Sequence, residues 1–302
     1  MVDIGGLFAY EFFQRAFLAG ICSALLCAAL GVFIVLKRAS LIGEGIAHLS
    51  FGGIAIGLVL AIYPLYTALI LALLGTLLIS LLNRSKIVYA ETAIGLMFSA
   101  GLAIGAVLAS VGGGFSVDLF SYLFGSLLTV SAQDLAIIIL LTAIALIFLA
   151  IFYKELVLMT FDERSARLSG VPVIAFEVAF NVLVALAVVA SIKIVGALLV
   201  SALLIIPAAS AMQFSRSFKG TMLSAIVLGL SSVMAGMLVS FYFDIATGGA
   251  IVLIGLLVFG VCVAVRKLFK LGKKELAPDT ICAHGLQETR FEAKEESSNK
   301  EV

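Results

Sequence analysis

Long apolar runs, broken at short intervals by charged residues or by Gly and Pro, dominate the chain. The hydrocarbon core of a bilayer is about 30 Å thick, so a membrane-spanning helix needs roughly 20 predominantly apolar residues. Dividing the chain at its breaks therefore predicts a series of spanning helices. The predicted spans lie at about 16–36, 43–62, 64–83, 90–111, 134–153, 173–191, 194–214, 221–243 and 248–266. The expected fold class is all-α, a polytopic transmembrane helix bundle.

The two predicted spans that flank Lys193 are the hardest to separate. A single Lys and Gly196 are weak indications of a turn between them. The pattern leaves two arrangements open, either nine spans or eight, with one member of this pair broken or partly re-entrant.

Composition supports the membrane assignment. The chain has 302 residues, of which 63% are hydrophobic and only 12% charged, whereas soluble domains carry about 25% charged residues. The formal net charge of +1 gives no global field that would attract nucleic acid, so no nucleic-acid partner is expected. The expected surroundings are the lipid bilayer.

The positions of the basic residues predict the orientation. They fall in alternate loops of the nine-span arrangement, and the positive-inside rule places those loops in the cytoplasm. The residues are Lys37 and Arg38, Arg84 and Lys86, Lys154 with Arg164 and Arg167, Arg216 and Lys219, and Arg266 to Lys274. The loops at 112–114 and 244–248 are then external. Residues 117–131 are too short to form a separate span and are expected to lie at, or dip into, the external interface.

The composition changes abruptly near residue 270. The remaining residues lack a periodic apolar face and contain too few apolar side chains to offset the entropy of ordering. We therefore predict a transmembrane domain at 1–269 and a cytoplasmic, disordered tail at 270–302.

Glu44 and His48 are the most informative polar residues within the predicted spans. They are four residues apart, so they share one helix face, and a carboxylate with an imidazole makes half of a transition-metal site. Ionisable residues inside a membrane are costly and commonly face a cavity. Two structural alternatives remain open, an interfacial ion pair of Glu44 with Arg38 and a hydrogen bond from His48 to a backbone carbonyl.

Other acidic residues near the helix ends have simpler explanations. Asp244 stands beside Gly248 and Gly249 between the last two apolar runs, where an isolated Asp is more often a helix cap. Caps or interfacial charges are also the favoured explanation for Glu91, Glu177, Asp118 and Asp134.

Residues 154–172 form the longest polar segment between spans, on the predicted cytoplasmic side. It has the pattern of a short amphipathic helix on the membrane surface. Asp162 and Glu163 offer charge to a partner, and Ala166 and Gly170 permit close contact. The alternative is an ordinary solvated loop.

Several catalytic motifs are absent from the sequence. It contains no G-x-x-x-x-G-K-[ST] phosphate-binding loop, no G-x-S-x-G elbow and no H-E-x-x-H pair. The chain is therefore expected not to be an enzyme, and any ATP hydrolysis must come from another polypeptide. No permanently bound cofactor is expected.

Taken together, these segments resemble the permease subunits of the ABC-3 class of metal transporters, which import zinc, manganese or iron in bacteria and archaea. The resemblance runs from about Phe13 to Arg266. It is carried by RASLIGEGIAHLSFGGIAIG, SYLFGSLLTVS, FDERSARLSGV, VGALLVSALLIIPAASA and DIATGGAIVL, in that order.

The resemblance implies roles for individual residues. Glu44, His48 and Asp244 would contact the transported metal ion, and FDERSARLSGV would dock on the ATPase through an E-x-x-A-x-x-x-G arrangement of Glu163, Ala166 and Gly170. Many relatives have Asp where this chain has Glu44 and Pro where it has Ala246, so the ligand geometry and the metal stay open.

The resemblance also implies partners and a location. A cytoplasmic ABC ATPase, an extracytoplasmic metal-binding protein and a second permease copy are expected, in the plasma membrane of a prokaryote. The competing hypothesis is a proton-coupled secondary metal transporter that uses Glu44 and His48 as a relay. Such a carrier predicts a pronounced internal repeat, which the sequence does not show.

Overall fold

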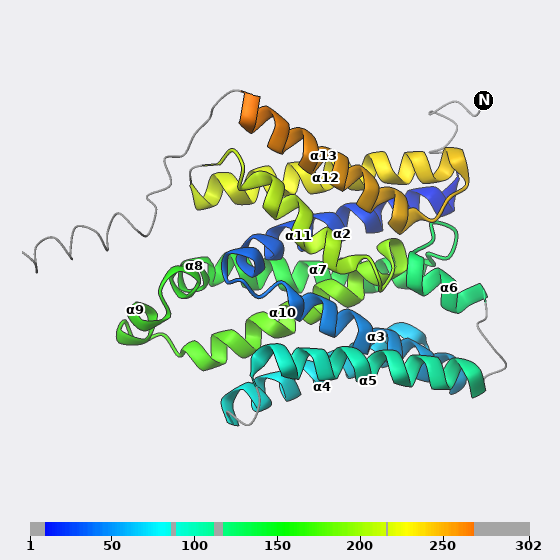
Figure 1. Ribbon diagram of the computed structural model, residues 1–302. Helices are drawn as coiled ribbons and strands as arrows, with labels where there is room; N and C mark the ends of the chain where they lie inside the picture. Colours follow the sequence, from blue (N-terminus) through cyan, green and yellow to red (C-terminus); the bar gives the residue numbers. More distant parts are fainter. Residues whose placement is uncertain (1–9, 86–88, 112–116, 216, 269–302) are drawn as a thin grey trace, which may run out of the picture. The chain divides into compact units, whose positions relative to one another are not determined.

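The computed structural model describes residues 10–85, 89–111, 117–215 and 217–268, and these residues form helices and no strand. The helices are labelled α2 to α13 in Figure 1. Their bounds are α2 Glu11–Leu36, α3 Leu41–Val59, α4 Pro64–Ser85, α5 Ala90–Val111, α6 Val117–Phe124, α7 Ala132–Ile151, α8 Tyr153–Phe161, α9 Glu163–Leu168, α10 Val173–Val195, α11 Val200–Ala211, α12 Phe218–Phe243 and α13 Thr247–Leu268.

Eight of these helices, within the described residues, are long and apolar enough to cross a membrane: α2, α3, α4, α5, α7, α10, α12 and α13. This confirms the predicted all-α polytopic bundle. A helix satisfies its backbone hydrogen bonds internally, which is why such long apolar runs fold as helices in lipid. The predicted tail at 270–302 lies outside the described residues, and its disorder stays a prediction.

The ninth predicted span, 194–214, is a helix of only 12 residues, α11. Twelve residues rise about 18 Å, too little to cross the hydrocarbon core. The break lies at 196–199, after Gly196 with φ +90°, and not at Lys193, which is buried in the last turn of α10. Of the two arrangements left open, the described residues therefore have eight spans, with the second member of this pair shortened. The turn follows Gly196, and the charge of Lys193 has a buried partner in place of a turn.

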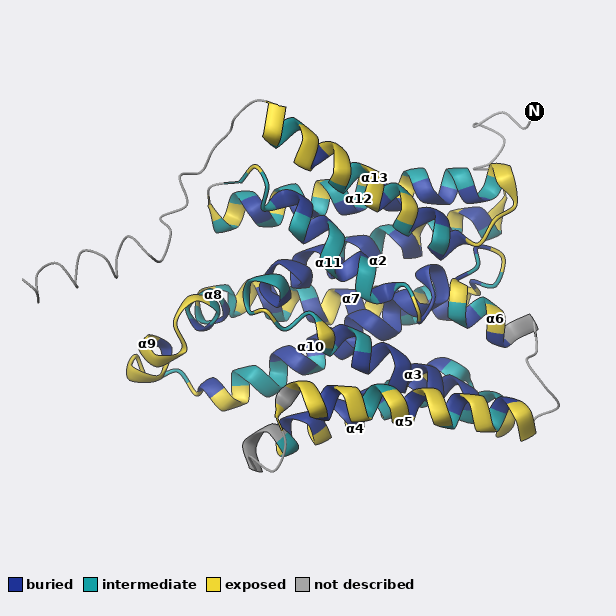
Figure 2. Ribbon diagram, viewed as in Figure 1, coloured by how far each residue is buried: buried dark blue, intermediate teal, exposed yellow. Residues whose placement is uncertain are grey.

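Helix α2 lies at the centre of the described bundle. It packs against α12, α11, α10 and α7, and its buried residues run along most of its length. In Figure 2 the buried residues follow α2, α3 and α10, whereas exposed residues line the outward faces of α5 and α13. Those exposed faces are apolar, as at Leu253 and Val107, and suit contact with lipid or with another membrane subunit.

Helix α3 is held between α5 and α4. Its contact with α5 brings the two backbones together, because a Cβ atom at Gly101 of α5 would lie 2.3 Å from the carbonyl oxygen of His48. A Cβ atom at Gly52 would likewise lie 2.8 Å from the carbonyl oxygen of Gly101. Small residues thus fix α3, which carries the candidate metal ligands, firmly against its neighbour.

Candidate metal pathway and coupling segment

The connection from α2 to α3 fixes where the candidate ligands stand. Lys37 caps α2, and Arg38 adopts a left-handed conformation with φ +55°, which is uncommon for a residue with a side chain. This tight turn brings the chain back as α3 from Leu41. Glu44 consequently lies in the first turn of α3, and His48 lies one turn deeper.

His48 is buried, with 6% of its surface exposed, and its Nδ1 atom has no hydrogen-bond partner. Its ring lies 4.1 Å from the ring of Phe98 on α5, measured between centroids. A buried polar atom without a partner is unfavourable, so its presence calls for an explanation. A ligand that approaches from the same helix face would provide one.

Glu44 is half-buried and makes no hydrogen bond or ion pair with any described residue. The alternative ion pair with Arg38 is therefore absent. Within the described residues, no three His, Cys, Asp or Glu side chains group closely enough to hold a metal ion. One chain thus provides at most a partial site at Glu44 and His48.

Asp244 stands apart from this pair. It is the exposed C-cap of α12, with φ +51°. The Ser240 hydroxyl donates to the Ile245 carbonyl at 2.6 Å and lies 3.1 Å from the Thr247 hydroxyl, which fixes the turn into α13. The structure does not bring Asp244 together with Glu44 and His48, so a shared site for all three is not formed within one chain.

The predicted coupling segment forms a helical corner of α8 and α9. Asp162 caps α9, because its carboxylate accepts hydrogen bonds from the backbone amides of Arg164 and Ser165. The Ser165 hydroxyl also donates to this carboxylate, and these hydrogen bonds hold the pKa of Asp162 below its usual value.

The E-x-x-A-x-x-x-G residues of this corner have different environments. Glu163 is exposed and pairs with Arg167 at 2.6 Å. Ala166 is fully buried against Met159 and Val173, so its small size serves packing within the chain. Gly170 ends the corner with φ +81° and has open space around it.

A cavity of about 540 Å³ lies beside this corner on the predicted cytoplasmic side. Its lining includes Leu41 and Ile42 at the start of α3, one turn before Glu44. Lys37 also lines it, 5.1 Å above the ring of Phe180. Burial lowers the pKa of Lys37, and the nearby Glu177 and Glu163 partly oppose that shift. The cavity thus adjoins both the coupling segment and the helix of the candidate ligands.

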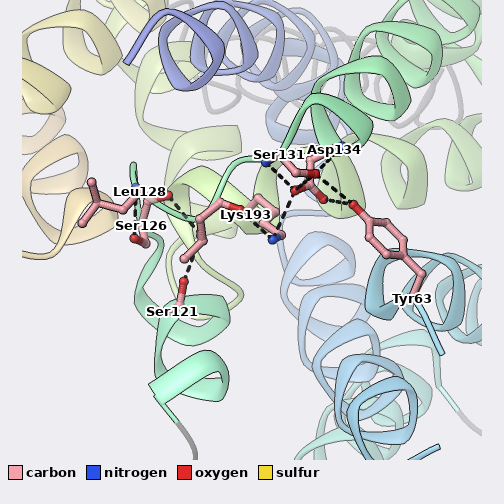
Figure 3. A network of polar contacts seen from close by, with 8 residues as sticks. Tyr63, Ser121, Ser126, Leu128, Ser131, Asp134 and Lys193 are labelled. Carbon is pink, nitrogen blue, oxygen red and sulfur yellow. Dashed lines mark hydrogen bonds and ion pairs between the residues drawn. The ribbon is translucent and has the colours of Figure 1, made fainter. Parts of the chain in front are cut away.

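A second polar cluster, shown in Figure 3, was missed by the sequence analysis. Lys193 at the end of α10 pairs with Asp134 at the start of α7 at 3.3 Å. Asp134 also forms a capping box with Ser131, which confirms its interpretation as a helix cap. A single basic residue between two long apolar runs of sequence was the available indication, since such residues require a partner at membrane depth.

Comparison with known proteins gives this arrangement a family. Residues 9–266 match the ABC 3 transport family. The chain belongs to this family.

Individual relatives cover most of the chain. An uncharacterized membrane protein of Synechocystis sp. is 35% identical over 85% of this chain and 92% of its own length. The manganese import system permease protein ScaB of Streptococcus gordonii is 34% identical, with the same coverage of both chains. The structure of PsaBC from Streptococcus pneumoniae in complex with Fab matches with a TM-score of 0.78 at 32% identity, over 86% of this chain and 93% of that one.

Membership of the ABC-3 family decides between the two transport hypotheses. The chain is the multi-pass permease component of an ABC transporter in a prokaryotic plasma membrane, and the ATPase is a separate subunit. The alternative of a proton-coupled secondary carrier finds no support. As a transport subunit, the chain is not itself an enzyme.

Proposed function

We propose that this chain carries divalent metal ions inward across the plasma membrane, with manganese as the principal cargo, and that Glu44 and His48 contact the ion in transit. The similarity to a manganese import permease supports the cargo. The unpaired Nδ1 atom of His48 supports the contact. A carboxylate with an imidazole suits manganese, and also zinc and ferrous iron.

An incomplete site suits a transport pathway. Transport requires binding strong enough to admit the ion and weak enough to release it. Two ligands on one rigid helix meet that requirement, with water or a second copy of the permease completing the coordination. We propose a homodimer for this reason, with an exposed apolar helix face of each copy available for the contact.

We further propose that α9 docks on the cytoplasmic ATPase and that an extracytoplasmic protein delivers the metal. Glu163 is exposed there, Asp162 and Ala166 stabilise the corner, and Gly170 lies in open space. Asp244 lies exposed at the opposite, predicted external end, where a carboxylate would attract an arriving cation.

Uptake of ⁵⁴Mn²⁺ into cells that lack other manganese importers tests the cargo. The chain is expressed with its ATPase and metal-binding partner, and excess unlabelled Mn²⁺, Zn²⁺ or Fe²⁺ competes. We expect ATP-dependent uptake that unlabelled manganese suppresses most strongly. Uptake without the ATPase would contradict the permease assignment, whereas stronger competition by zinc would change only the cargo.

Recovery of the ATPase with the affinity-tagged permease tests the docking. Glu163→Lys reverses an exposed charge, and we expect it to lower ATPase recovery while membrane insertion persists. Lys154→Glu on the adjacent α8, at an exposed position, serves as the matched charge reversal outside α9. Equal recovery for wild type and both variants would mean that the ATPase docks elsewhere.

A further inference from the structure

Two breaks in helical structure cross each other at the predicted external end of α10. The first break follows α6 at Gly125, with φ +77°, and the second follows α10 at Gly196, with φ +90°. A Cβ atom added at Gly125 would lie 2.0 Å from the carbonyl oxygen of Ile194, and one added at Gly196 would lie 2.2 Å from that of Leu123. A Cβ atom added at Gly248 of α13 would lie 1.7 Å from the carbonyl oxygen of Val195. Three backbones therefore meet too closely for any side chain.

Backbone hydrogen bonds join the two breaks. The amide of Ala197 donates to the Tyr122 carbonyl at 2.8 Å, and the amide of Ser126 donates to the Lys193 carbonyl at 3.2 Å. Irregular backbone at membrane depth needs such partners, because lipid offers none. We call residues 122–126 together with 193–198 the outer crossing.

The Lys193–Asp134 ion pair joins the outer crossing, to which Lys193 belongs, to the start of α7. The exposed fractions of the two side chains are 10% and 1%. The Lys193 ammonium also donates to the Thr129 carbonyl at 3.0 Å and lies 4.8 Å above the ring of Tyr122. The pair thus ties α10 to the segment that follows α6 and to α7.

The carboxylate of Asp134 is fully engaged. Its Oδ2 atom accepts from the Ser131 amide and hydroxyl, each at 2.8 Å. Its Oδ1 atom accepts from the Tyr63 hydroxyl, which comes from the connection between α3 and α4. As Figure 3 shows, side chains from distant parts of the sequence converge here. The cluster therefore also reaches the end of α3, the helix that carries Glu44 and His48.

Stability alone gives a weak reason for this ion pair. Replacing both partners of a buried pair by apolar residues of similar size is often neutral or stabilising, because neither charge must then be desolvated. What apolar residues do not supply is directional attachment of one particular arrangement. An ion pair at a helix break can therefore hold two segments together in one arrangement and release them in another.

We propose that Lys193 and Asp134 are positioning residues that hold the outer crossing closed, and that their separation admits the metal ion from outside. This inference rests on the proposed transport function. The neighbouring turn at Asp244 leads into Gly248 of the same contact, so an ion attracted by that carboxylate arrives next to the outer crossing. With the pair intact, the segment at 125–129, which we call the covering segment, is held against the end of α10 through the Ser126 amide and the Thr129 carbonyl.

Thiol labelling from outside the cell tests this proposal. Leu127 lies in the covering segment and is 6% exposed, so Leu127→Cys in an otherwise cysteine-free full chain reports its opening. The neighbouring Leu128 is 72% exposed, and Leu128→Cys should react with a membrane-impermeant maleimide at all times. Ala185→Cys, in the buried middle of α10, should never react unless the protein unfolds.

The decisive variant is the double replacement Lys193→Met with Asp134→Leu, which leaves no unpaired charge. We expect labelling at Leu127→Cys to rise about tenfold or more, as a closed crossing shifts toward open, while both control positions stay unchanged. Metal uptake should fall, because transport requires the permease to alternate between an open and a closed outer entrance. Lys193→Arg keeps the positive charge, so labelling at Leu127→Cys should stay nearly as slow as with the intact pair.

Three results would overturn the proposal. Unchanged labelling at Leu127→Cys in the double variant would make the pair a static structural contact. Equal increases at Leu127→Cys and Ala185→Cys would indicate unfolding in place of opening. Normal uptake despite faster labelling would separate the outer crossing from transport. Labelling can be measured without a metal cargo. If the proposed transport function is wrong, wild-type uptake will be absent while the labelling pattern can still be measured.

Discussion

The candidate ligands on α3 and the ion pair at the outer crossing put polar groups at membrane depth in opposite ways. Glu44 and His48 have polar atoms without partners among the described residues, and glycine contacts hold their helix rigidly. Lys193 and Asp134, by contrast, contact each other and five further polar or aromatic groups.

This difference separates two uses of costly groups in a membrane. A buried polar atom left unpaired carries a penalty that an arriving ligand or an ordered water removes. A fully paired charge needs no ligand, and its directional contacts instead specify one arrangement of the chain. Charge at membrane depth therefore does not by itself mark a metal site, and the presence or absence of partners is the distinguishing observation.

The largest expected effect tests the unpaired member of the comparison. His48→Ala should abolish metal uptake, with a loss of about a hundredfold or more, because removing even an outer-shell partner of a metal ligand costs 10–100-fold. Uptake is measured beside permease abundance and ATPase recovery. Ser50→Ala on the same helix, where the hydroxyl donates to the Ile46 carbonyl, is the matched control. Normal uptake by His48→Ala would remove the proposed ligand role and leave the permease assignment intact.

The next effect concerns stability at the paired site. Lys193→Met alone leaves the Asp134 carboxylate buried without its counter-ion, which should destabilise the fold by about 3–5 kcal/mol. The double replacement with Asp134→Leu should recover most of that loss. Unfolding in detergent, followed by circular dichroism, measures both. Equal stability of the single variant and wild type would mean that the pair carries no net constraint.

A smaller effect tests ligand geometry at Glu44. Glu44→Asp keeps the carboxylate and should reduce uptake only several-fold, since a charge-assisted contact survives at a shifted position. Glu44→Gln removes the charge and should reduce uptake more.

Asp244→Asn, at the opposite end, should give a loss between those of Glu44→Asp and His48→Ala. The concentration dependence of manganese uptake distinguishes weaker binding from slower turnover, and equal losses for Glu44→Asp and Glu44→Gln would exclude a role for the charge.

The smallest effect is expected at an exposed ion pair, which serves as the reference for the buried pair of Lys193 and Asp134. Glu163 and Arg167 form an ion pair as short as any described, at 2.6 Å, but on a solvated surface. Glu163→Gln should change the free energy of unfolding by less than about 1 kcal/mol, because water screens such pairs. The same detergent unfolding assay applies. A loss comparable to that of Lys193→Met would show that burial is not what distinguishes the two sites.

Local pattern predicted much of this molecule. Apolar run length located the eight spanning helices, and the four-residue spacing placed Glu44 and His48 on one face. The same reasoning left eight and nine spans open around Lys193 and Gly196, since a run of sequence does not show whether the charge of Lys193 has a partner. That partner is Asp134, which is 59 positions away along the chain.

The sequence by itself determined that the chain lies in a lipid bilayer, that it is helical and which family it resembles, because these properties depend on composition, periodicity and ordered motifs. Only the tertiary structure decided which polar groups are satisfied. His48 on α3 lies against Phe98 on α5, fifty positions away along the chain, and its Nδ1 atom is left without a partner. Pairing depends on distance in space, and packing of glycine-lined helices sets those distances.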